Sequence, residues 1–394
     1  MPRSDAHEAA VERVPEVSAA PERTSAPRGA APLSPALEPN LYLEPEIVRL
    51  EQRAIFERTW QLAGHVSDLA EPGSYMTTEV VDQPVLVVRD QEGEIRAFRN
   101  VCRHRGSRLL AGSGQCGKAI RCLYHGWTYR TDGTLIGVPE GRDIPDLDKS
   151  RLGLHQVRAE VFCGLIFVNL DPGAEPLGAR LGGLAERLAR YDLPSLKRFG
   201  RGGDVQPANW KVVVENYIEG YHIPIAHPSL MRLLDYQRYD VEVYDDWVWF
   251  EAPMRDKPSD NRLERLYQRL VRPAPGLGPE DRRVWRFVLI YPNTTIDLYP
   301  DQVNTWRLWP DGADVTRDDW GTFRHPDAPA SSRVVQRINN VLNTTVLKED
   351  VDLVDNVQRG IRTRGYHPGP LSQREAAVAW FADRIRADLE RAVG

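Results

Sequence analysis

The stretch VCRHRGSRLLAGSGQCGKAIRCLYHGWTY, residues 101–129, decides how the N-terminal half of this chain folds. It places Cys102 two residues before His104 and Cys122 three residues before His125. The chain has only four cysteines in 394 residues, which do not make a disulfide framework, so a metal centre is the first hypothesis. A structural zinc ion usually separates paired ligands by roughly two to four residues, and the single residue between Cys102 and His104 is tight for that geometry.

The complete spacing of these four side chains, C-x-H-x17-C-x2-H, resembles the ligand motif of Rieske [2Fe–2S] domains. The flanking residues in CRHRG and CLYHGW strengthen the resemblance. In that family two thiolates hold one iron and two imidazoles hold the other, which raises the reduction potential above that of an all-cysteine cluster. The resemblance therefore implies Cys102 and Cys122 on the first iron, and His104 and His125 on the second.

Two further positions in these loops distinguish the types of Rieske protein. Respiratory Rieske proteins carry two additional cysteines in the loops, joined as a disulfide, whereas this chain has Ser107 and Tyr124 there. The difference favours the oxygenase type over a subunit of a membrane respiratory complex. The remaining cysteines have ordinary interpretations: Cys116 lies in a GSGQCGK turn, and Cys163 is expected in the core of a strand formed by VFCGLIF.

A second pair of histidines lies in ANWKVVVENYIEGYHIPIAHPSL, residues 208–230. His222 and His227 are separated by four residues, and Pro224 between them argues against one continuous helix. Taken alone, they read as two ordinary histidines. Beside a Rieske motif they suggest the facial triad of non-haem Fe(II) oxygenases, in which two histidines and a carboxylate leave positions open for dioxygen and substrate. The block NWK…ENYIEGYHIPIAHP closely resembles the mononuclear iron motif of Rieske non-haem iron oxygenase catalytic subunits.

The resemblance places the third iron ligand, an Asp, on a late helix. VLKEDVDLVDNVQRG, residues 346–360, is similar to the family's ED…VQRG segment and implies Asp350, which stands eight residues before the Gln of VQRG. Glu349, Asp352 and Asp355 remain alternatives for this ligand. Acidic residues on a helix are mostly solvated, so the sequence by itself does not separate the four.

The resemblance also implies a homotrimer in which the cluster of one subunit serves the iron of its neighbour. It places Glu219, three residues before His222, as the carboxylate that bridges the two centres. Glu219 would accept hydrogen bonds from His222 of its own subunit and from His125 of the next one. The alternative interpretation of Glu219 is a solvated or capping carboxylate near a helix end.

The same resemblance covers nearly all of the chain after residue 40 and implies an α+β fold of two domains. Residues 41–172 are expected to form an N-terminal helix and an all-β Rieske domain. Residues 173–394 are expected to form a catalytic domain of the helix-grip type, an antiparallel sheet wrapped over a long helix. The residue patterns agree, because short β-rich runs fill the first range and a helical pattern spans residues 331–362. The Pro- and Ala-rich segment 1–40 reads as a disordered tail.

Such an enzyme activates dioxygen with electrons delivered singly, whereas reduced nicotinamide delivers them in pairs. The chain contains neither a G-x-G-x-x-G unit after a strand nor the cysteine spacing of a plant-type ferredoxin. We therefore expect a separate NAD(P)H-dependent flavin reductase as partner, with or without a ferredoxin. The basic residues around the cluster loops either receive an acidic partner or are ordinary solvated charges: Arg103, Arg105, Arg108, Lys118 and Arg121.

The sequence leaves the substrate open between two classes. The general resemblance to aromatic-ring-hydroxylating α subunits puts oxygenation of an aromatic compound or a small organic acid first. Glu rather than Asp three residues before the first histidine resembles oxygenases of quaternary ammonium compounds, so a betaine-like cation, which aromatic side chains would suit, comes second. A zinc-stabilised binding module without enzymatic activity is the alternative of another class. The aromatic candidates for substrate contact are Tyr217, Tyr221, Trp247, Trp249, Tyr291, Tyr299 and Trp306.

Composition limits the other partners. Hydrophobic residues make up 41% and charged residues 27% of the chain, as in ordinary globular proteins. The formal net charge of -5 gives no electrostatic reason to expect nucleic acid or an anionic membrane. The sequence has no apolar run near the roughly 18 residues of a membrane span, and its N-terminus lacks the apolar segment of a secretory signal. We therefore expect a cytoplasmic protein.

Overall fold

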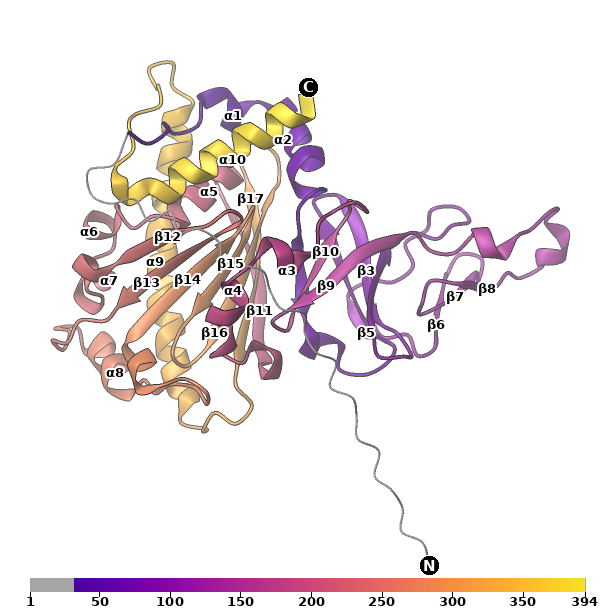
Figure 1. Cartoon of the computed structure of the whole chain (residues 1–394), viewed down its shortest axis with the longest axis horizontal. Helices are drawn as coiled ribbons and strands as arrows, with labels where there is room; N and C mark the ends of the chain where they lie inside the picture. Colours follow the sequence, from indigo (N-terminus) through magenta and orange to yellow (C-terminus); the bar gives the residue numbers. More distant parts are fainter. Residues whose placement is uncertain (1–31, 394) are drawn as a thin grey trace, which may run out of the picture.

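The structure, a computed structural model, describes residues 32–393 and shows two β-rich domains side by side along the long axis (Figure 1). The first domain consists mainly of strands. The second consists of an antiparallel sheet with helices on both faces. This arrangement confirms the predicted α+β class. No helix of the described chain is long and apolar enough to cross a membrane.

The strands of the first domain are β1 (Gln61–His65), β2 (Ser74–Val80), β3 (Gln83–Arg89), β4 (Ile95–Arg99), β5 (Ser113–Gln115), β6 (Ala119–Arg121), β7 (Thr128–Arg130), β8 (Leu135–Gly137), β9 (Gln156–Phe162) and β10 (Leu165–Asn169). Seven of them form an antiparallel sheet in the order β1-β10-β9-β4-β3-β2-β5, and β6-β7-β8 form a second sheet. Before them come α1 (Pro39–Leu43), α2 (Pro45–Glu51) and a π-helical turn, Gln52–Phe56. Short 3-10 turns lie at Val66–Leu69, Gly141–Asp143 and Lys149–Arg151.

The second sheet of seven strands has the order β11-β17-β16-β15-β14-β13-β12. Its strands are β11 (Lys197–Gln206), β12 (Asp240–Val243), β13 (Trp247–Pro253), β14 (Val284–Ile290), β15 (Thr294–Leu298), β16 (Val303–Pro310) and β17 (Thr316–Arg324). Its helices are α3 (Leu177–Arg180), α4 (Leu184–Ala189), α5 (Trp210–Tyr217), α6 (Ile223–Ala226), α7 (Pro228–Leu233), α8 (Arg262–Leu270), α9 (Ser332–Ile361) and α10 (Ala376–Val393). Short 3-10 turns lie at Leu193–Ser195, Tyr236–Arg238, Pro279–Arg283 and Gln373–Glu375.

Strand β3 is buried on both faces, which explains its unbroken apolar run VLVV. Val85 and Val87 face the core shared with the N-terminal helices, and Leu86 and Val88 face a second core beneath the cysteine loops. All four side chains are 0% exposed. A strand covered on both faces has a continuous apolar sequence rather than an alternating one.

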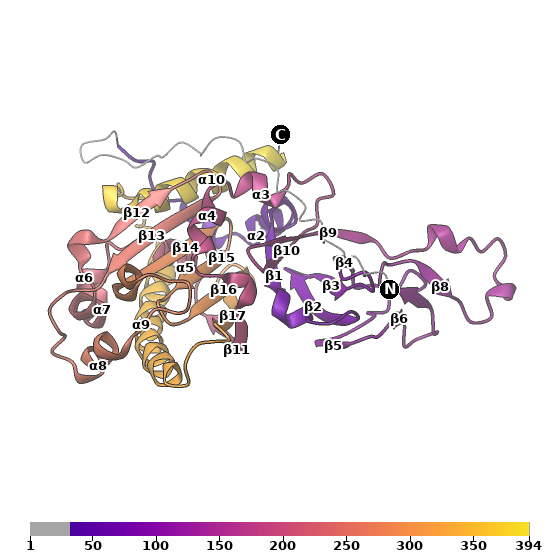
Figure 2. The same cartoon turned by 60° about the horizontal axis from the view of Figure 1, so that its bottom comes forward.

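In the second domain α9 crosses one face of the sheet, and α8 packs beside it (Figures 1 and 2). Val335, Ile338 and Leu342 share one side of α9, because they are spaced by three and four residues. They pack in one buried cluster with Trp285 and Tyr299 from the sheet side. The opposite face of the sheet is covered by α3 and α4. The helix-grip prediction for this domain therefore describes the observed packing, and α9 lies close to its predicted bounds.

A fully buried ion pair attaches α5 to the N-terminal segment. Lys211 Nζ lies 2.5 Å from Glu51 Oε1, and both side chains are 0% exposed. Trp210 Nε1 donates to the second carboxylate oxygen of Glu51 at 2.8 Å. Removing two charges from water is costly, so both must stay paired and hydrogen-bonded. The pair therefore fixes the start of α5 relative to α2.

The described structure begins before residue 40, the predicted end of the tail. Residues 1–31 lie outside the described residues, so the prediction of disorder stays a prediction for them. The segment before α1 instead packs against α10. Leu37 is 0% exposed, and the Arg386 guanidinium donates to the carbonyl group of Ala36 at 2.8 Å. Burial of this one leucine gives the segment a fixed position.

The sequence predicted Cys163 within a strand, and this prediction is wrong. β9 ends at Phe162 and β10 begins at Leu165, so Cys163 and Gly164 form the turn between them, with φ angles of +48° and +78°. Two residues of positive φ are typical of the tight turns that join antiparallel strands. A Cβ atom at Gly164 would lie 2.6 Å from Pro194 Cα, so glycine is required there.

Candidate functional site

Two loops of the first domain, residues 102–107 and 122–127, have the same backbone turn. In each loop the N–H of the cysteine donates to the carbonyl group five residues later, at 2.8 Å. The N–H of the glycine four residues after the cysteine donates back to the cysteine carbonyl group, at 3.1 Å and 3.0 Å. Gly106 and Gly126 both have φ of +73°, a conformation that favours glycine. The two loops therefore present their cysteines in matching positions.

The loops turn their thiols inward and their imidazoles outward. Cys102 and Cys122 are 3% and 2% exposed and belong to a buried cluster beneath the loops. His104 and His125 are exposed, their ring centroids lie 4.7 Å apart, and Trp127 stacks on His104 at 4.8 Å. Two buried sulfur donors beside two exposed nitrogen donors are the ligand set of a Rieske cluster, so these side chains fit that group.

Hydrogen bonds favour the thiolate form of Cys122. Burial by itself would raise the pKa of this thiol. The backbone N–H groups of Tyr124 and His125 donate to the sulfur and bring the pKa below its ordinary value overall. The thiolate is the form that binds metal, so these hydrogen bonds favour metal binding at the second loop.

A tyrosine beneath the first loop donates to the other thiol. Tyr129 Oη lies 3.3 Å from Cys102 Sγ and 3.1 Å from the backbone nitrogen of Arg103. The N–H of Arg103 can only donate, so the tyrosine oxygen accepts there and its own proton is free for the sulfur. Burial, followed by the contact with Cys102, raises the pKa of Tyr129 and keeps the phenol protonated. A donor on a sulfur ligand raises the reduction potential of a cluster.

Substitution Tyr129→Phe is expected to lower the reduction potential of the cluster by about 40 mV. Loss of one hydrogen bond of about 1 kcal/mol corresponds to that shift for a one-electron couple. A redox titration followed by visible absorbance measures it. Tyr124→Phe is the control, because this phenol is 56% exposed at the loop tip. An unchanged potential in Tyr129→Phe, or an equal fall in the control, would contradict the assigned hydrogen bond.

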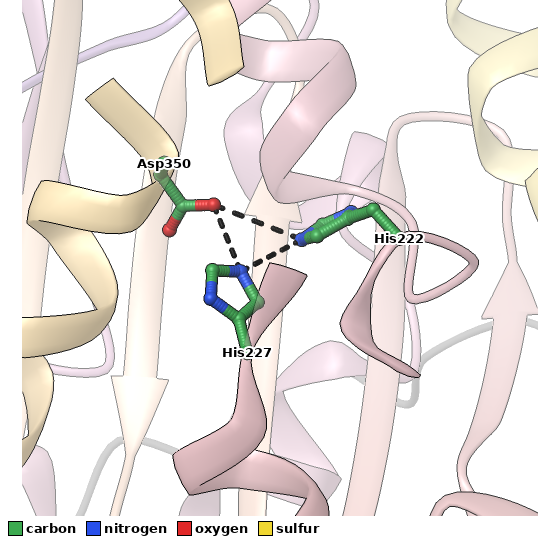
Figure 3. Close-up of side chains that lie close together, drawn as sticks. All are labelled: His222, His227 and Asp350. Carbon is green, nitrogen blue, oxygen red and sulfur yellow. Dashed lines mark hydrogen bonds and ion pairs between the residues drawn. The ribbon is translucent and has the colours of Figure 1, made fainter. Parts of the chain in front are cut away.

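A second centre is formed by His222, His227 and Asp350 (Figure 3). His222 directly precedes α6 and His227 separates α6 from α7, while Asp350 lies within α9. His227 Nε2 lies 3.0 Å from both His222 Nε2 and Asp350 Oδ1, and His222 Nε2 lies 3.7 Å from the same oxygen. The three ligand atoms all lie within 4.8 Å of one another. Two imidazoles and one carboxylate that leave further positions open are the donor set of a mononuclear ferrous ion.

Carboxylates hold the outer nitrogen of both histidines. Glu219 Oε1 accepts from His222 Nδ1, and Glu349 Oε2 lies 2.8 Å from His227 Nδ1. An ionised carboxylate only accepts, so each Nδ1 carries a proton and each Nε2 is turned toward the other two side chains of the site. Burial opposes the charged ring, but hydrogen bonds to Asp350 and Glu349 raise the pKa of His227.

The four acidic candidates of α9 take different places. Asp350 faces the inner nitrogens, whereas Glu349 contacts the outer nitrogen of one histidine. Asp352 is exposed, and Asp355 pairs with an arginine one turn later at 2.6 Å. Asn216 of α5, which the sequence did not single out, donates to Asp350 Oδ1 at 2.8 Å. Its only sequence signal is its place, after Glu215, in the polar end of a helix that leads to the histidines.

A cavity of about 190 Å³ adjoins the three side chains. It lies between α5, α9 and the strands β14, β15 and β16, and rings form much of its wall. The aromatic residues that line it are Tyr217, Tyr239, Trp285, Phe287, Tyr299 and Trp306. Three of the predicted substrate-contact residues, Tyr217, Tyr299 and Trp306, are therefore brought together here.

Other predicted contacts lie elsewhere. Tyr221 is 55% exposed on the outer surface. Trp247 and Trp249 project from the face of β13 that packs on α3 and α4. Tyr291 Oη donates to Asp388 of α10 at 2.5 Å. Alternate residues of a strand face opposite sides, and the strand sequence does not say which side will face the ligand site.

The lining residues that the sequence did not single out include Tyr239, Trp285, Phe287 and Asp297. Trp285 and Phe287 alternate on β14, and Phe287 pairs with Asp297 across the strands. The two-residue spacing of these aromatic residues in VWRFVLI indicates that they share one face of a strand. It identifies one face of the strand, but only the position of α9 shows that this face borders the cavity.

The iron ligands can be tested by counting metal. His222→Ala, His227→Ala and Asp350→Ala are each expected to fall from about three irons per chain to about two, with the visible spectrum of the cluster retained. The facial site loses one of only three ligands, whereas the cluster loops are unaffected. Asp352→Ala is the matched control and should keep all of its iron. Depletion in Asp352→Ala with full iron in Asp350→Ala would move the carboxylate ligand by two residues.

Two family matches agree with this geometry. Residues 59–148 match the Rieske [2Fe-2S] domain, and residues 187–391 match the ring hydroxylating alpha subunit (catalytic domain). The first range contains both cysteine loops, and the second contains both histidines and Asp350. The chain therefore has a Rieske [2Fe–2S] domain and a catalytic domain with a candidate mononuclear iron site. The alternative of a zinc-stabilised binding module has no support in these matches.

Several characterised proteins are similar over most of the chain. A carnitine monooxygenase oxygenase subunit of Acinetobacter baumannii is 30% identical, covering 82% of this chain and 85% of the relative. A glycine betaine monooxygenase oxygenase subunit of Chromohalobacter salexigens is 31% identical, with coverages of 89% and 85%. A chloroplastic choline monooxygenase of Amaranthus tricolor is 30% identical, with coverages of 83% and 72%.

Solved structures show the same architecture. The quaternary ammonium Rieske monooxygenase CntA superposes with a TM-score of 0.78 at 26% identity, covering 90% of this chain and 96% of that one. Naphthalene 1,2-dioxygenase from Rhodococcus sp. superposes with a TM-score of 0.73 at 23% identity, covering 90% and 94%. The second likeness shows the fold alone.

Proposed function

This chain belongs to the ring-hydroxylating α-subunit family of Rieske oxygenases, and we propose that it monooxygenates a quaternary ammonium compound. One observation carries the proposal: six aromatic residues line the cavity beside the candidate iron site. Aromatic faces attract an alkylated ammonium ion without needing a hydrogen bond from it. The sequence ranked an aromatic compound or small organic acid first, but the relatives described above are named for carnitine, glycine betaine and choline. Their names support the second substrate class, a quaternary ammonium compound.

The residues around the candidate iron site keep its donor atoms available. A bound ferrous ion would supply dioxygen activation, and a Rieske cluster would supply single electrons. His222, His227 and Asp350 would hold the iron. Glu219 and Glu349 keep the outer imidazole nitrogens protonated, so the inner lone pairs stay directed at the site. The apolar part of the wall limits the water that reaches the substrate.

A single-turnover screen tests the substrate class without a known reductase. The protein is reduced with dithionite, freed of excess reductant, and exposed to oxygen with carnitine, glycine betaine, choline or benzoate. We expect mass spectrometry to find oxidation of at least one ammonium compound and none of benzoate. Asp350→Ala should oxidise nothing. Oxidation of benzoate alone would restore the aromatic or organic acid reading.

An oxygenase subunit requires a separate reductase, and we propose an NAD(P)H-dependent flavin protein, with or without a ferredoxin. Arg105, Lys118 and Arg121 are exposed around the cluster loops and suit an acidic partner. The other two basic candidates are already engaged, because Arg108 pairs with a glutamate at 2.8 Å and Arg103 donates to a backbone carbonyl group at 2.7 Å. A cytoplasmic location stays part of the proposal.

The two centres lie toward opposite ends of the folded molecule, and this separation supports a role for a second subunit. The second cluster loop, residues 122–127, joins β6 to β7, whereas α6 and α7 lie at the far end of the second domain in both views (Figures 1 and 2). Leu123 at the tip of one cluster loop is 90% exposed, and Ile225 beside the histidine pair is 89% exposed. Exposed apolar side chains at two separate places suit a head-to-tail ring. We extend the proposal to a homotrimer in which Glu219 lies between the two centres.

Substitution Glu219→Gln is expected to slow electron transfer between the centres. The amide keeps the volume but loses the charge that fixes the outer nitrogen of His222. We expect near-normal iron and an unchanged cluster spectrum, with at least about tenfold slower oxidation of the pre-reduced cluster in stopped flow. Glu349→Gln is the matched control, because this carboxylate holds the other histidine within the same subunit.

Mixed oligomers separate transfer between subunits from transfer within one chain. Cys122→Ser removes a cluster ligand and Asp350→Ala removes an iron ligand, so each variant alone should be inactive. Co-expressed chains should recover activity, because the intact cluster of one subunit would face the intact iron site of the next. Inactive mixed oligomers would place transfer within one chain and remove Glu219 from the subunit interface.

A further inference from the structure

The cavity contains a buried carboxylate that pairs with no Lys or Arg of the described residues. Asp297 on β15 is 6% exposed, and its oxygens accept from Tyr217 Oη at 2.8 Å, Trp306 Nε1 at 3.3 Å and Tyr299 Oη at 3.5 Å. Burial raises the pKa of this carboxyl to about 6, against the opposing effect of these donors. The three donors stabilise the ionised form of Asp297, because each uses a carboxylate oxygen as its acceptor.

The charges around the cavity have one sign. Glu219, Asp297 and Asp350 line it, whereas no Lys or Arg from residues 32–393 does. A ferrous ion would balance two of these three negative charges, which leaves the charge of one carboxylate. A substrate carboxylate would enter this space without a cationic partner, and an unpaired buried charge is unfavourable.

The amide groups of the wall offer little to an anion. Gln206, Asn216 and Asn343 are the lining amides of the described chain. Each amide nitrogen already donates to another side chain of the protein, at 3.0 Å, 2.8 Å and 2.5 Å respectively. Each amide therefore keeps at most one N–H for an anionic group, because its other N–H already holds the wall in place.

The rings around Asp297 pack against one another, so the aromatic wall is already formed before a substrate binds. Tyr217 meets Phe287 edge to face at a centroid distance of 6.4 Å, and Phe287 meets Tyr299 in the same way at 6.0 Å. Trp285 meets Tyr299 at 4.9 Å. A cation that enters this wall finds both aromatic surface and one fixed negative charge.

We propose that Asp297 is the counter-ion of the substrate's ammonium group and that the substrate is a quaternary ammonium cation without a carboxylate. This inference rests on the proposed function and narrows its substrate class. Compounds that carry a carboxylate beside the ammonium group, such as carnitine and glycine betaine, are disfavoured by the same residue. A choline-like alcohol fits the charge of the site.

Binding measurements test this directly. Iron-loaded protein at pH 8 is titrated with choline, with glycine betaine, and with the uncharged carbon isostere of choline, in which a tert-butyl group replaces the trimethylammonium group. Quenching of tryptophan fluorescence reports binding, because Trp285 and Trp306 line the cavity. We expect choline to bind at least about tenfold more tightly than either of the other two compounds.

Asp297→Asn keeps the shape of the side chain and removes its charge. We expect the affinity for choline to fall by at least about tenfold and the affinity for the isostere to stay within about twofold. Asp301→Asn is the matched control: Asp301 is 4% exposed and accepts from Tyr267 Oη at 3.1 Å, but it does not line the cavity. This control should keep all three affinities.

The outcomes separate this inference from the function on which it rests. Glycine betaine binding as tightly as choline, or choline binding no better than its isostere, overturns the role of Asp297 with wild-type protein alone. Unchanged choline affinity in Asp297→Asn overturns it as well. In all three of these outcomes, the protein still binds an ammonium compound, so the proposed function is retained. Failure of the wild-type protein to bind any ammonium compound removes both.

Discussion

The position of α9 across the sheet is the constraint on which the candidate iron site depends. His227 and Asp350 are 123 residues apart in sequence, yet their ligand atoms lie 3.0 Å apart. Apolar residues at three- and four-residue spacing hold α9 against the sheet, and Asn216 of α5 holds the carboxylate by a hydrogen bond. A shift of α9 by one turn would move Asp350 by about 5.4 Å, beyond the reach of both imidazoles.

The other helix of the site, α5, is held from the N-terminal side. The buried pair of Glu51 and Lys211 joins it to α2, and Trp210 adds a second hydrogen bond to the same carboxylate. Leu37 and Arg386 tie the preceding segment to α10. Residues that precede the strands of the first domain thus help to position the histidines of the second, so the two domains share one framework.

In both candidate centres, hydrogen bonds with neighbouring groups orient the metal ligands. At the cluster loops, backbone N–H groups stabilise the thiolate of Cys122 against the effect of burial. At the iron site, Glu219 and Glu349 fix the protons of the two imidazoles on the outer nitrogens. The cavity extends the pattern, because three hydrogen-bond donors favour the ionised form of Asp297 within an aromatic wall.

The sequence by itself determined the cluster loops and the histidine pair, because each is a local feature. A turn closed by Gly106 or Gly126 places its cysteine and histidine whatever the rest of the chain does. Sequence could not decide which aromatic residues surround the cavity, or that Asp297 faces it. A strand tells only that alternate residues share a face, and a helix tells only which residues share a side. Which face is covered is settled by long-range packing, so only the tertiary structure turned Trp249 away from the cavity and Trp306 toward it.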